Sequence, residues 1–572
     1  MERLEAKKIN GRTYYYYSEW GWVDGKCRRL WQKYLGKPSD IAKAMDGGPP
    51  PDWAEVFQFG LPTALWQESD RQGIVREVDS LCPKRDQGLS VGQYLAVAAV
   101  NRAIDPVSKR GMWEWFCATT LRRLLPDADK ASLDARRFWD HMDMVDPDAI
   151  PKIWRNIVSG TLRRENIDLS QVSYDGTNFY TFISTFNTNC SIAQRGKNKQ
   201  GRCNLRQVSY ALFCTKDSMI PLLYDVYEGN CNDARQFPVM IRRFHQFLKE
   251  LSANADLPTP KPTLVFDKGN NSAANIELLD QLELHFVGSV KLGEHHELAS
   301  ISNGDERFEP CRRPGLEGIK AFSLHKQVYG RRRRVVVVFN QELFTTQWQT
   351  LNNDVAKAVG RLAELKQRLD DRANGLIKGG RPPTEASVKK QCAAILKRPF
   401  LAQVISADVQ ARERSPLMCY RIDTEALARV ADTYLGKKLV ITTREAWGDD
   451  EVIETYHGQY VIEHIFRDMK TTQTGTWWPL HHWTEQKIRV HALYCTIATL
   501  LRALLLRRTR HAGLTISMQR LLDELAGIRE VINVRKQPRR RQKEQRQAVL
   551  SKLNDVQKTL FDALELERGK AV

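Results

Sequence analysis

The stretch QVSYDGTNFY, residues 171–180, marks a change of pattern along the chain. Upstream of it, apolar residues recur at spacings of three and four, which predicts helices. The stretch itself is rich in aromatic and β-branched residues, which predicts a strand. Two similar runs follow, RQVSYALFCT (206–215) and IPLLYDVYEG (220–229). Three strands in a row at this point predict the start of a sheet.

The sequence after these strands alternates between helix and strand. Residues 233–251 and 272–284 have helical spacing of apolar residues, and PTLVFDKGN (262–270) and HFVGSVK (285–291) read as buried strands. Consecutive strands followed by alternating helices and strands predict an α/β fold, in which helices pack on a mixed sheet.

This alternation stops after Lys291 and resumes at KLVITTRE, residues 438–445. The intervening sequence contains a hairpin-like pair of strands around Gly330, then a charged helix at 354–375 and a loop rich in Gly and Pro. We therefore expect an insertion domain within the sheet-forming part of the chain.

The two ends of the chain have different patterns. Aromatic-rich runs flank Asp24-Gly25, a strong hairpin signal, and a Pro-rich linker follows at 47–53. Beyond residue 510 the chain is basic, with RKQPRRRQKEQR at 535–546, and it ends in an apolar stripe from Leu550 to Leu564. This stripe predicts a tail helix that packs or self-associates.

Together these patterns divide the chain into six predicted parts. They are a DNA-binding β-module (1–46), a helical region for DNA-end binding (54–168), the first part of the α/β core (169–291), the insertion domain (292–436), the second part of the core (437–510) and a basic helical tail (511–572).

The charge of the chain favours a polyanionic partner. Lys and Arg total 87 against 68 Asp and Glu, which gives a net charge of +19, so DNA or RNA is the first candidate. The start, MERLEAKKIN, lacks the apolar run of a secretory signal, and we expect a cytoplasmic protein. The apolar run from Ala492 to Leu501 is about half the length of a membrane span, so we expect a buried helix.

Several common sites are absent from the sequence. The eleven cysteines form no C-x-x-C pair, and neither a P-loop nor an H-E-x-x-H motif occurs. The pairs His295-His296 and His481-His482 have no third ligand at a useful spacing, so we expect packing or surface roles. Zinc chemistry and P-loop ATP hydrolysis therefore have no support.

Two aspartates follow predicted strands. Asp175 comes after Val172 and Tyr174, and Asp267 comes after Val265 and Phe266. Either one alone is more simply a turn cap. In a mixed sheet of this order, however, the two strands can be neighbours, so both carboxylates can meet at one rim.

A later amphipathic segment, YHGQYVIEHIFRDMK (456–470), supplies a third acid. On a helix, Tyr456, Gln459, Glu463 and Lys470 fall within an arc of about 60°, and the apolar residues point the other way. Three carboxylates at one point repel unless cations neutralise them, and Mg²⁺ suits such ligands. Two such ions support in-line phosphoryl transfer.

These blocks resemble a known family. YDGTNF, FDKGN and the Tyr456 segment resemble the three catalytic blocks of DDE transposases from bacterial insertion sequences, which have an RNase H-like fold. One branch has Tyr, Arg, Glu and Lys in its third block at the spacings of Tyr456, Gln459, Glu463 and Lys470. The resemblance spans roughly residues 171–506. KINGRTYYYY, KYLGKP and NRAIDPVSK also resemble the family's N-terminal region.

The resemblance implies a role for each matching residue. Asp175, Asp267 and Glu463 are expected to hold two Mg²⁺ ions, for which Mn²⁺ can substitute. Tyr456 and Lys470 are expected to hold DNA phosphates. The expected partners are double-stranded DNA, at transposon ends and target, and further copies of the chain in a dimer or larger assembly.

Other nearby residues are weaker candidates. Lys268 is a further candidate phosphate ligand, and Thr177 is placed to steady the metal site. Gln459 departs from the family's Arg and loses a charged phosphate contact, for which Arg467 is a possible replacement. The run Arg331 to Arg334 is either a solvated face or a set of phosphate contacts.

Two other readings stay open. The same fold also suits an RNase H-like nuclease or an inactive transposase relic that only binds DNA, and the Gln459 departure favours the relic. A basic architectural DNA-binding protein, in which the carboxylates are structural, is the reading that involves no enzyme.

Overall fold

The computed structural model describes residues 2–23, 26–45, 51–83, 88–196, 201–253, 261–471, 475–478, 480–535 and 544–566. The chain divides into two compact units. One contains Met1–Ala64, Glu114–Pro126 and Gln519–Val572, and the other contains Leu65–Trp113 and Asp127–Met518.

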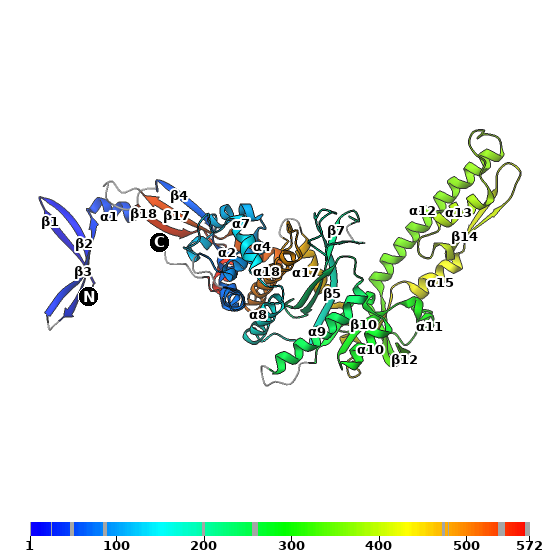
Figure 1. Ribbon diagram of the computed structural model, residues 1–572, viewed down its shortest axis with the longest axis horizontal. Helices are drawn as coiled ribbons and strands as arrows, with labels where there is room; N and C mark the ends of the chain where they lie inside the picture. The colour runs from blue at the N-terminus through cyan, green and yellow to red at the C-terminus, as the bar shows by residue number, and fades with distance from the viewer. Residues whose placement is uncertain are drawn as a thin grey trace. The chain divides into compact units, whose positions relative to one another are not determined.

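A mixed sheet is the centre of the second unit, which confirms the predicted α/β class (Figure 1). Strands β5 (Gln171–Tyr180), β9 (Thr263–Phe266) and β10 (His285–Val290) run parallel to one another, and the strands on either side of these three are antiparallel to them. The strand order is β11 (Glu309–Pro310), β12 (Ile319–Val328), β13 (Arg331–Asn340), β16 (Lys437–Thr442), β10 (His285–Val290), β9 (Thr263–Phe266), β5 (Gln171–Tyr180), β7 (Arg206–Thr215) and β6 (Gln194–Arg195), with β8 (Pro221–Glu228) on β7.

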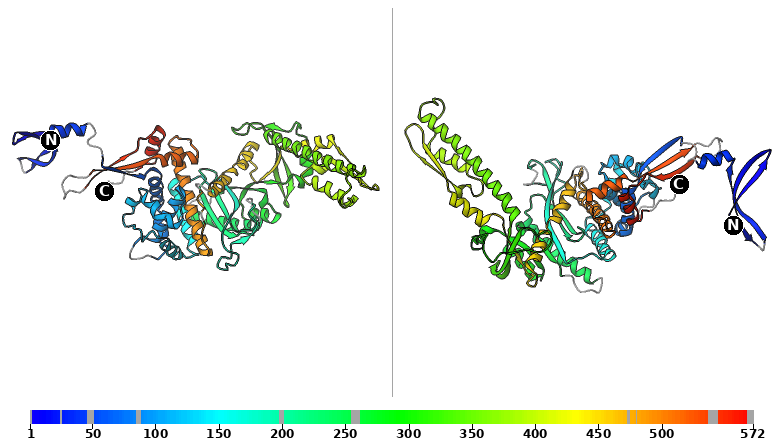
Figure 2. Two further views of the ribbon diagram at one scale, coloured as in Figure 1. Left: turned by 90° about the horizontal axis from the view of Figure 1, so that it is seen from above. Right: turned by 180° about the vertical axis from the view of Figure 1, so that it is seen from behind.

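Helices pack on the sheet through aromatic side chains. In α9 (Asp233–Ala253), Phe237 lies 5.2 Å from the Tyr174 ring and 5.0 Å from the Phe266 ring. In α18 (Glu485–His511), Thr496 hydrogen-bonds the Tyr210 hydroxyl of β7. By length and composition α18 could cross a membrane, but 89% of its most apolar window is buried in this fold. Figure 2 shows α18, in orange, among the other helices.

The hairpin expected in the insertion domain belongs instead to the central sheet. Strand β13 pairs with β12 and with β16, from Arg334 opposite Thr442 to Phe339 opposite Lys437. The run Val335 to Val338 is buried, and a strand that is apolar on both faces needs the interior of a sheet.

The part of the insertion outside the sheet has its own core. That core includes Leu362, Val388 and Val404, and backbone N–H of Asn340 donates to Gly436 O at 2.8 Å where the two ends meet. Its elements are α12 (Gln341–Ala373), α13 (Glu385–Ile395), α14 (Leu401–Val404), β14 (Ile405–Gln410), β15 (Leu417–Ile422) and α15 (Thr424–Tyr434).

The C-terminal tail is only partly helical, contrary to expectation. Strands β17 (Arg529–Arg535) and β18 (Gln545–Leu550) form a sheet with β4 (Trp53–Gln58), and the helices described after residue 511 are α19 (Met518–Gly527) and α20 (Asp555–Ala563). In β17, Ile532 and Val534 are buried on one face, which is the alternation of a strand. Residues 536–543 of the basic run lie outside the described residues.

The N-terminal module is an antiparallel sheet of β1 (Glu2–Ile9), β2 (Arg12–Val23) and β3 (Lys26–Gly36). Val23 pairs with Lys26 as the predicted hairpin requires, although its turn residues 24–25 lie outside the described part.

The remaining helices are α1 (Pro38–Met45), α2 (Gly60–Gln72), α3 (Ile74–Asp79), α4 (Val91–Ile104), α5 (Met112–Cys117), α6 (Leu121–Leu124), α7 (Ala135–Asp143), α8 (Ile150–Glu165), α10 (Ala273–Gln281), α11 (His296–Ala299), α16 (Asp449–His457) and α17 (Tyr460–Lys470).

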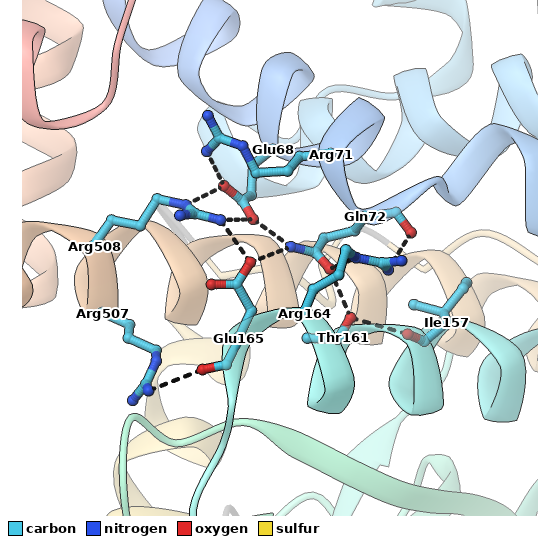
Figure 3. Close-up of polar contacts among 9 residues, drawn as sticks. All are labelled: Glu68, Arg71, Gln72, Ile157, Thr161, Arg164, Glu165, Arg507 and Arg508. Carbon is cyan, nitrogen blue, oxygen red and sulfur yellow. Dashed lines mark hydrogen bonds and ion pairs between the residues drawn. The ribbon is translucent and has the colours of Figure 1, made fainter. Parts of the chain in front are cut away.

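A polar cluster joins α2, α8 and α18 (Figure 3). The Glu68 carboxylate is 1% exposed and accepts from Arg508 Nε at 2.7 Å. Arg508 also donates to Glu165 at 2.6 Å, and Gln72 donates to both acids. Because a buried charge needs partners, this cluster couples the three helices.

Strand β8 is an edge strand, and side chains of two helices donate to two of its carbonyls. Trp154 Nε1 donates to Leu222 O at 3.1 Å, and Arg489 Nη1 donates to Val226 O at 2.8 Å. Helices α8 and α18 therefore supply donors that a further strand would otherwise supply.

Candidate active site

The parallel pairing of β5 and β9 brings two predicted acids together. Tyr174 lies opposite Phe266 in this ladder, so Asp175 and Asp267 follow at the same level on neighbouring strands. Both side chains are half-buried. Asp175 Oδ1 accepts from the Gly176 N–H at 2.8 Å, and Asp267 Oδ1 accepts from the Lys268 N–H at 2.7 Å. Asp267 therefore caps the short turn that begins at Lys268, whereas Asp175 lies inside β5, which continues to Tyr180, and not at the strand end expected from the sequence.

The predicted helix with Glu463 is split into α16 and α17 at Gly458 and Gln459. Here the backbone tightens, because Val461 N donates to Gly458 O and Ile462 N donates to Gln459 O, both at 3.2 Å. The apolar face is buried as predicted; its members are Val461, Ile462, Ile465 and Met469. Burial of that face leaves Glu463 exposed on the opposite side of α17.

Five of the predicted site residues line one cavity of about 870 Å³. They are Asp267, Lys268, Tyr456, Gln459 and Glu463. The cavity therefore brings the second aspartate of the sheet and the glutamate of α17 to one surface, together with three of the residues expected to bind DNA.

Three predicted residues lie outside this lining. Asp175 is on the strand beside Asp267. Arg467 is exposed on α17. The Lys470 ammonium donates to Thr177 Oγ1 and lies 5.4 Å from the centre of the Phe179 ring, so it ties the end of α17 to β5.

The cavity also contains residues that sequence reasoning missed. Lys438 of β16 is half-buried, with its ammonium 5.8 Å from the centre of the Tyr456 ring. Burial lowers the pKa of Lys438, and the nearby Lys268 lowers it further, against the opposing pull of Asp267 and Glu463. The available signal was a lysine inside the otherwise apolar strand KLVIT.

Ser289 of β10 is the second missed residue. The Tyr456 hydroxyl donates to Ser289 Oγ at 2.9 Å. Burial is the main cause that raises the pKa of Tyr456. The hydroxyl therefore stays protonated and held to the sheet.

The three acids are the type of ligand that Mg²⁺ requires. Carboxylate oxygens are its preferred protein ligands, and Asp175, Asp267 and Glu463 provide them. Within the described ranges, however, no three Asp, Glu, His or Cys side chains are grouped closely enough to hold a metal ion. The chemistry of the residues fits, with two acids side by side and the third on the wall of the cavity.

The Arg331 to Arg334 run is in part structural. Arg333 pairs with Asp280 at 2.6 Å and Arg334 pairs with Asp449 at 2.5 Å, and both side chains are buried. The phosphate role considered for this run does not apply to these two.

The part of the chain that contains this site matches a known family. Residues 169–501, more than half of the chain, match the family described as "Transposase DDE domain". The chain belongs to this family. It is a DNA transposase.

No curated protein sequence matches the transposase. Among solved structures, it is similar to the piggyBac transposase synaptic complex with hairpin DNA, with 10% identity, a TM-score of 0.36, and coverage of 83% of this chain and 82% of that one. A second is the Mos1 transposase paired-end complex with left transposon end, with 8% identity, a TM-score of 0.14, and coverage of 36% and 60%.

Proposed function

We propose that the transposase cuts phosphodiester bonds at the ends of its element and joins the exposed 3′ hydroxyl to target DNA. The observation that carries this proposal is the placement of Asp175 beside Asp267, with Glu463 on the wall of the cavity that Asp267 lines. Acids on neighbouring strands, beside a cavity, suit phosphoryl transfer.

Asp175, Asp267 and Glu463 are the residues that would hold the metal. Two bound Mg²⁺ ions would activate the attacking oxygen and stabilise the leaving one. Mn²⁺ has similar ligand preferences and is expected to substitute. For Glu463 to join the two aspartates, α17 has to bring its exposed carboxylate toward β9.

Cationic and polar residues around these acids bind the DNA backbone. Lys268, Tyr456 and Gln459 line the cavity, and Arg467 and Lys470 are on α17. The net charge of +19 favours double-stranded DNA over a neutral substrate. The protein would act in the bacterial cytoplasm, as a dimer or larger assembly that holds two element ends.

The chain is proposed to belong to the branch with the Tyr-Arg-Glu-Lys signature, among the transposases of bacterial insertion sequences, and the spacing of Tyr456, Glu463 and Lys470 supports this. Gln459 is the one departure from that signature. An inactive relic that binds DNA without cutting it is the second candidate, and the absence of a closed three-ligand group in the described residues favours it.

Nicking of supercoiled plasmid tests the proposal. Wild type is compared with Asp175→Asn, Asp267→Asn and Glu463→Gln, in Mg²⁺ or Mn²⁺ and in EDTA. The control is Glu228→Gln, which removes an exposed acid from β8 of the same sheet. We expect metal-dependent nicking by wild type and Glu228→Gln, and none by the other three, while all five proteins shift a DNA duplex in a gel.

Two results would contradict the proposal. Equal nicking by all variants would show that the acids are not the active site. Binding without nicking by wild type, repeated on plasmids that carry the cognate ends, would support the relic.

A further inference from the structure

The cavity that holds Asp267 and Glu463 needs positive charge to admit DNA. Both acids repel a phosphodiester, and Gln459, whose side chain faces the same cavity, is neutral. A DNA strand that approaches these acids is therefore best received by a cation that is already fixed among them.

Lys438 is in that position. It extends from β16, next to β10 in the central sheet, and lines the cavity with Asp267, Tyr456 and Glu463. Its ammonium lies 5.8 Å from the centre of the Tyr456 ring. Within the described part of the chain, the Lys438 ammonium makes no hydrogen bond or ion pair, so its N–H donors are available to a ligand.

Lys268 also lines this cavity, where it is exposed and already a candidate phosphate ligand, but the other two lysines of the lining are engaged by the protein. Lys437 is buried, and its ammonium donates to the backbone carbonyls of Ala299, Ile301 and Asp432. Lys291 pairs with Glu294 at 3.0 Å. Arg467, the residue that sequence reasoning considered as a substitute for the missing charge, does not line the cavity.

We propose that Lys438 binds a phosphate oxygen of the DNA backbone in this cavity and supplies the positive charge that Gln459 lacks. The inference rests on the proposed function, because it takes DNA as the occupant. The inference goes beyond the proposed function because it assigns the positive charge that binds phosphate to Lys438 on strand β16, and not to the helix that carries Glu463.

Salt-dependent DNA binding by the full chain tests this inference. The probe is a fluorescent 40-base-pair duplex of mixed sequence in EDTA, so that binding is measured without cleavage. Each phosphate contact contributes about 0.9 to the slope of log K against log salt. We expect Lys438→Met to weaken binding about tenfold and to reduce this slope by about one.

Three further variants distinguish the loss of a positive charge from a loss of folded structure as the cause of weaker DNA binding. Lys438→Arg keeps the charge and should retain the wild-type slope. The double variant Lys438→Met with Gln459→Arg should recover both affinity and slope. Lys249→Met is the charge control, because Lys249 is an exposed lysine of α9 outside the cavity. Circular dichroism checks that each variant is folded.

The inference is overturned if Lys438→Met changes the slope no more than Lys249→Met does. It is also overturned if Arg467→Met, and not Lys438→Met, lowers the slope and is the change that Gln459→Arg reverses. These outcomes are independent of the proposed function, whose failure appears as plasmid nicking that persists in Glu463→Gln.

Discussion

The Tyr456 hydroxyl donates a hydrogen bond to the Ser289 hydroxyl, and this bond ties α16 to β10 at the wall of the cavity. A hydroxyl has one proton to donate, so Tyr456 cannot donate to Ser289 and to a phosphate at once. Binding of DNA through Tyr456 therefore requires that this bond opens or that Ser289 becomes its donor.

Because Ser289 and a DNA phosphate compete for the Tyr456 proton, substitutions of Tyr456 and Ser289 should affect DNA binding differently. Tyr456→Phe and Ser289→Ala should each lower the free energy of unfolding by about 1 kcal/mol. Only Tyr456→Phe should weaken DNA binding, because Ser289→Ala leaves the tyrosine hydroxyl free to donate. Urea denaturation and duplex titration measure the two effects. Equal loss of affinity in both variants would argue against a phosphate contact by Tyr456.

Arg508 is expected to be important for stability. Arg508→Met leaves the buried Glu68 carboxylate without its main cation, and we expect a loss of about 3–5 kcal/mol. Arg71→Met is the matched control, since Arg71 also contacts Glu68, at 3.1 Å, from a more exposed position. Its loss should be below about 1 kcal/mol. Urea denaturation followed by tryptophan fluorescence measures both, and similar losses would show that Arg508 does not compensate Glu68.

Two buried histidines predict instability in acid. Burial lowers the pKa of His482 and His491, and the nearby Arg102 and Lys109 lower both further. Below about pH 6.5 the unfolded chain binds protons that the folded chain does not, so stability is complete above that pH and decreases as pH falls. Each histidine contributes a slope of up to about 1.4 kcal/mol per pH unit.

Unfolding midpoints in urea between pH 8 and pH 5 measure this effect. His482→Gln should make the decrease shallower, because one of the two buried titrating groups is gone. His481→Gln, a change at the exposed neighbouring residue, should leave the slope unchanged. An unchanged slope in both variants would locate the acid sensitivity elsewhere.

The ends of the insertion predict that it can be removed. Phe339 pairs with Lys437, and Asn340 contacts Gly436. Deletion of residues 341–435 would join Asn340 to Gly436, which creates an Asn-Gly turn between paired strands. We expect the shortened chain to fold with a cooperative melting transition.

A deletion of residues 340–436 is the control for the insertion experiment. It joins Phe339 directly to Lys437 and leaves no turn residues, so it should give aggregated or unfolded protein. The isolated segment 341–436 should fold on its own, because it contains a core of its own. Failure of both shortened chains would show that the insertion is needed for the central sheet.

The sequence was most informative where periodicity and local chemistry agree. Asp175 and Asp267 follow apolar residues, and the strand order makes β5 and β9 neighbours, although β5 continues past Asp175 to Tyr180 and does not end there. The buried face of α17 follows from helical spacing. Gly458 is an element boundary that periodicity alone does not give, since the same apolar spacing continues through it.

Long-range pairing accounts for the main errors. The local sequence of the β12–β13 hairpin is compatible with packing within an insertion and with pairing beside β16, so it does not distinguish the two. Strand β17 is paired with β4, which is more than 450 residues away in the chain and cannot be inferred from local sequence. Lys438 was missed for the same reason, because only the fold places it beside Glu463.

The covered carbonyls of β8 limit how copies of this transposase can associate. Because Trp154 and Arg489 occupy acceptors on the outer side of that strand, a second molecule cannot extend the sheet there without displacing them. Extension of the sheet by a second copy at β8 is therefore disfavoured, which limits edge-to-edge fibre growth at this strand.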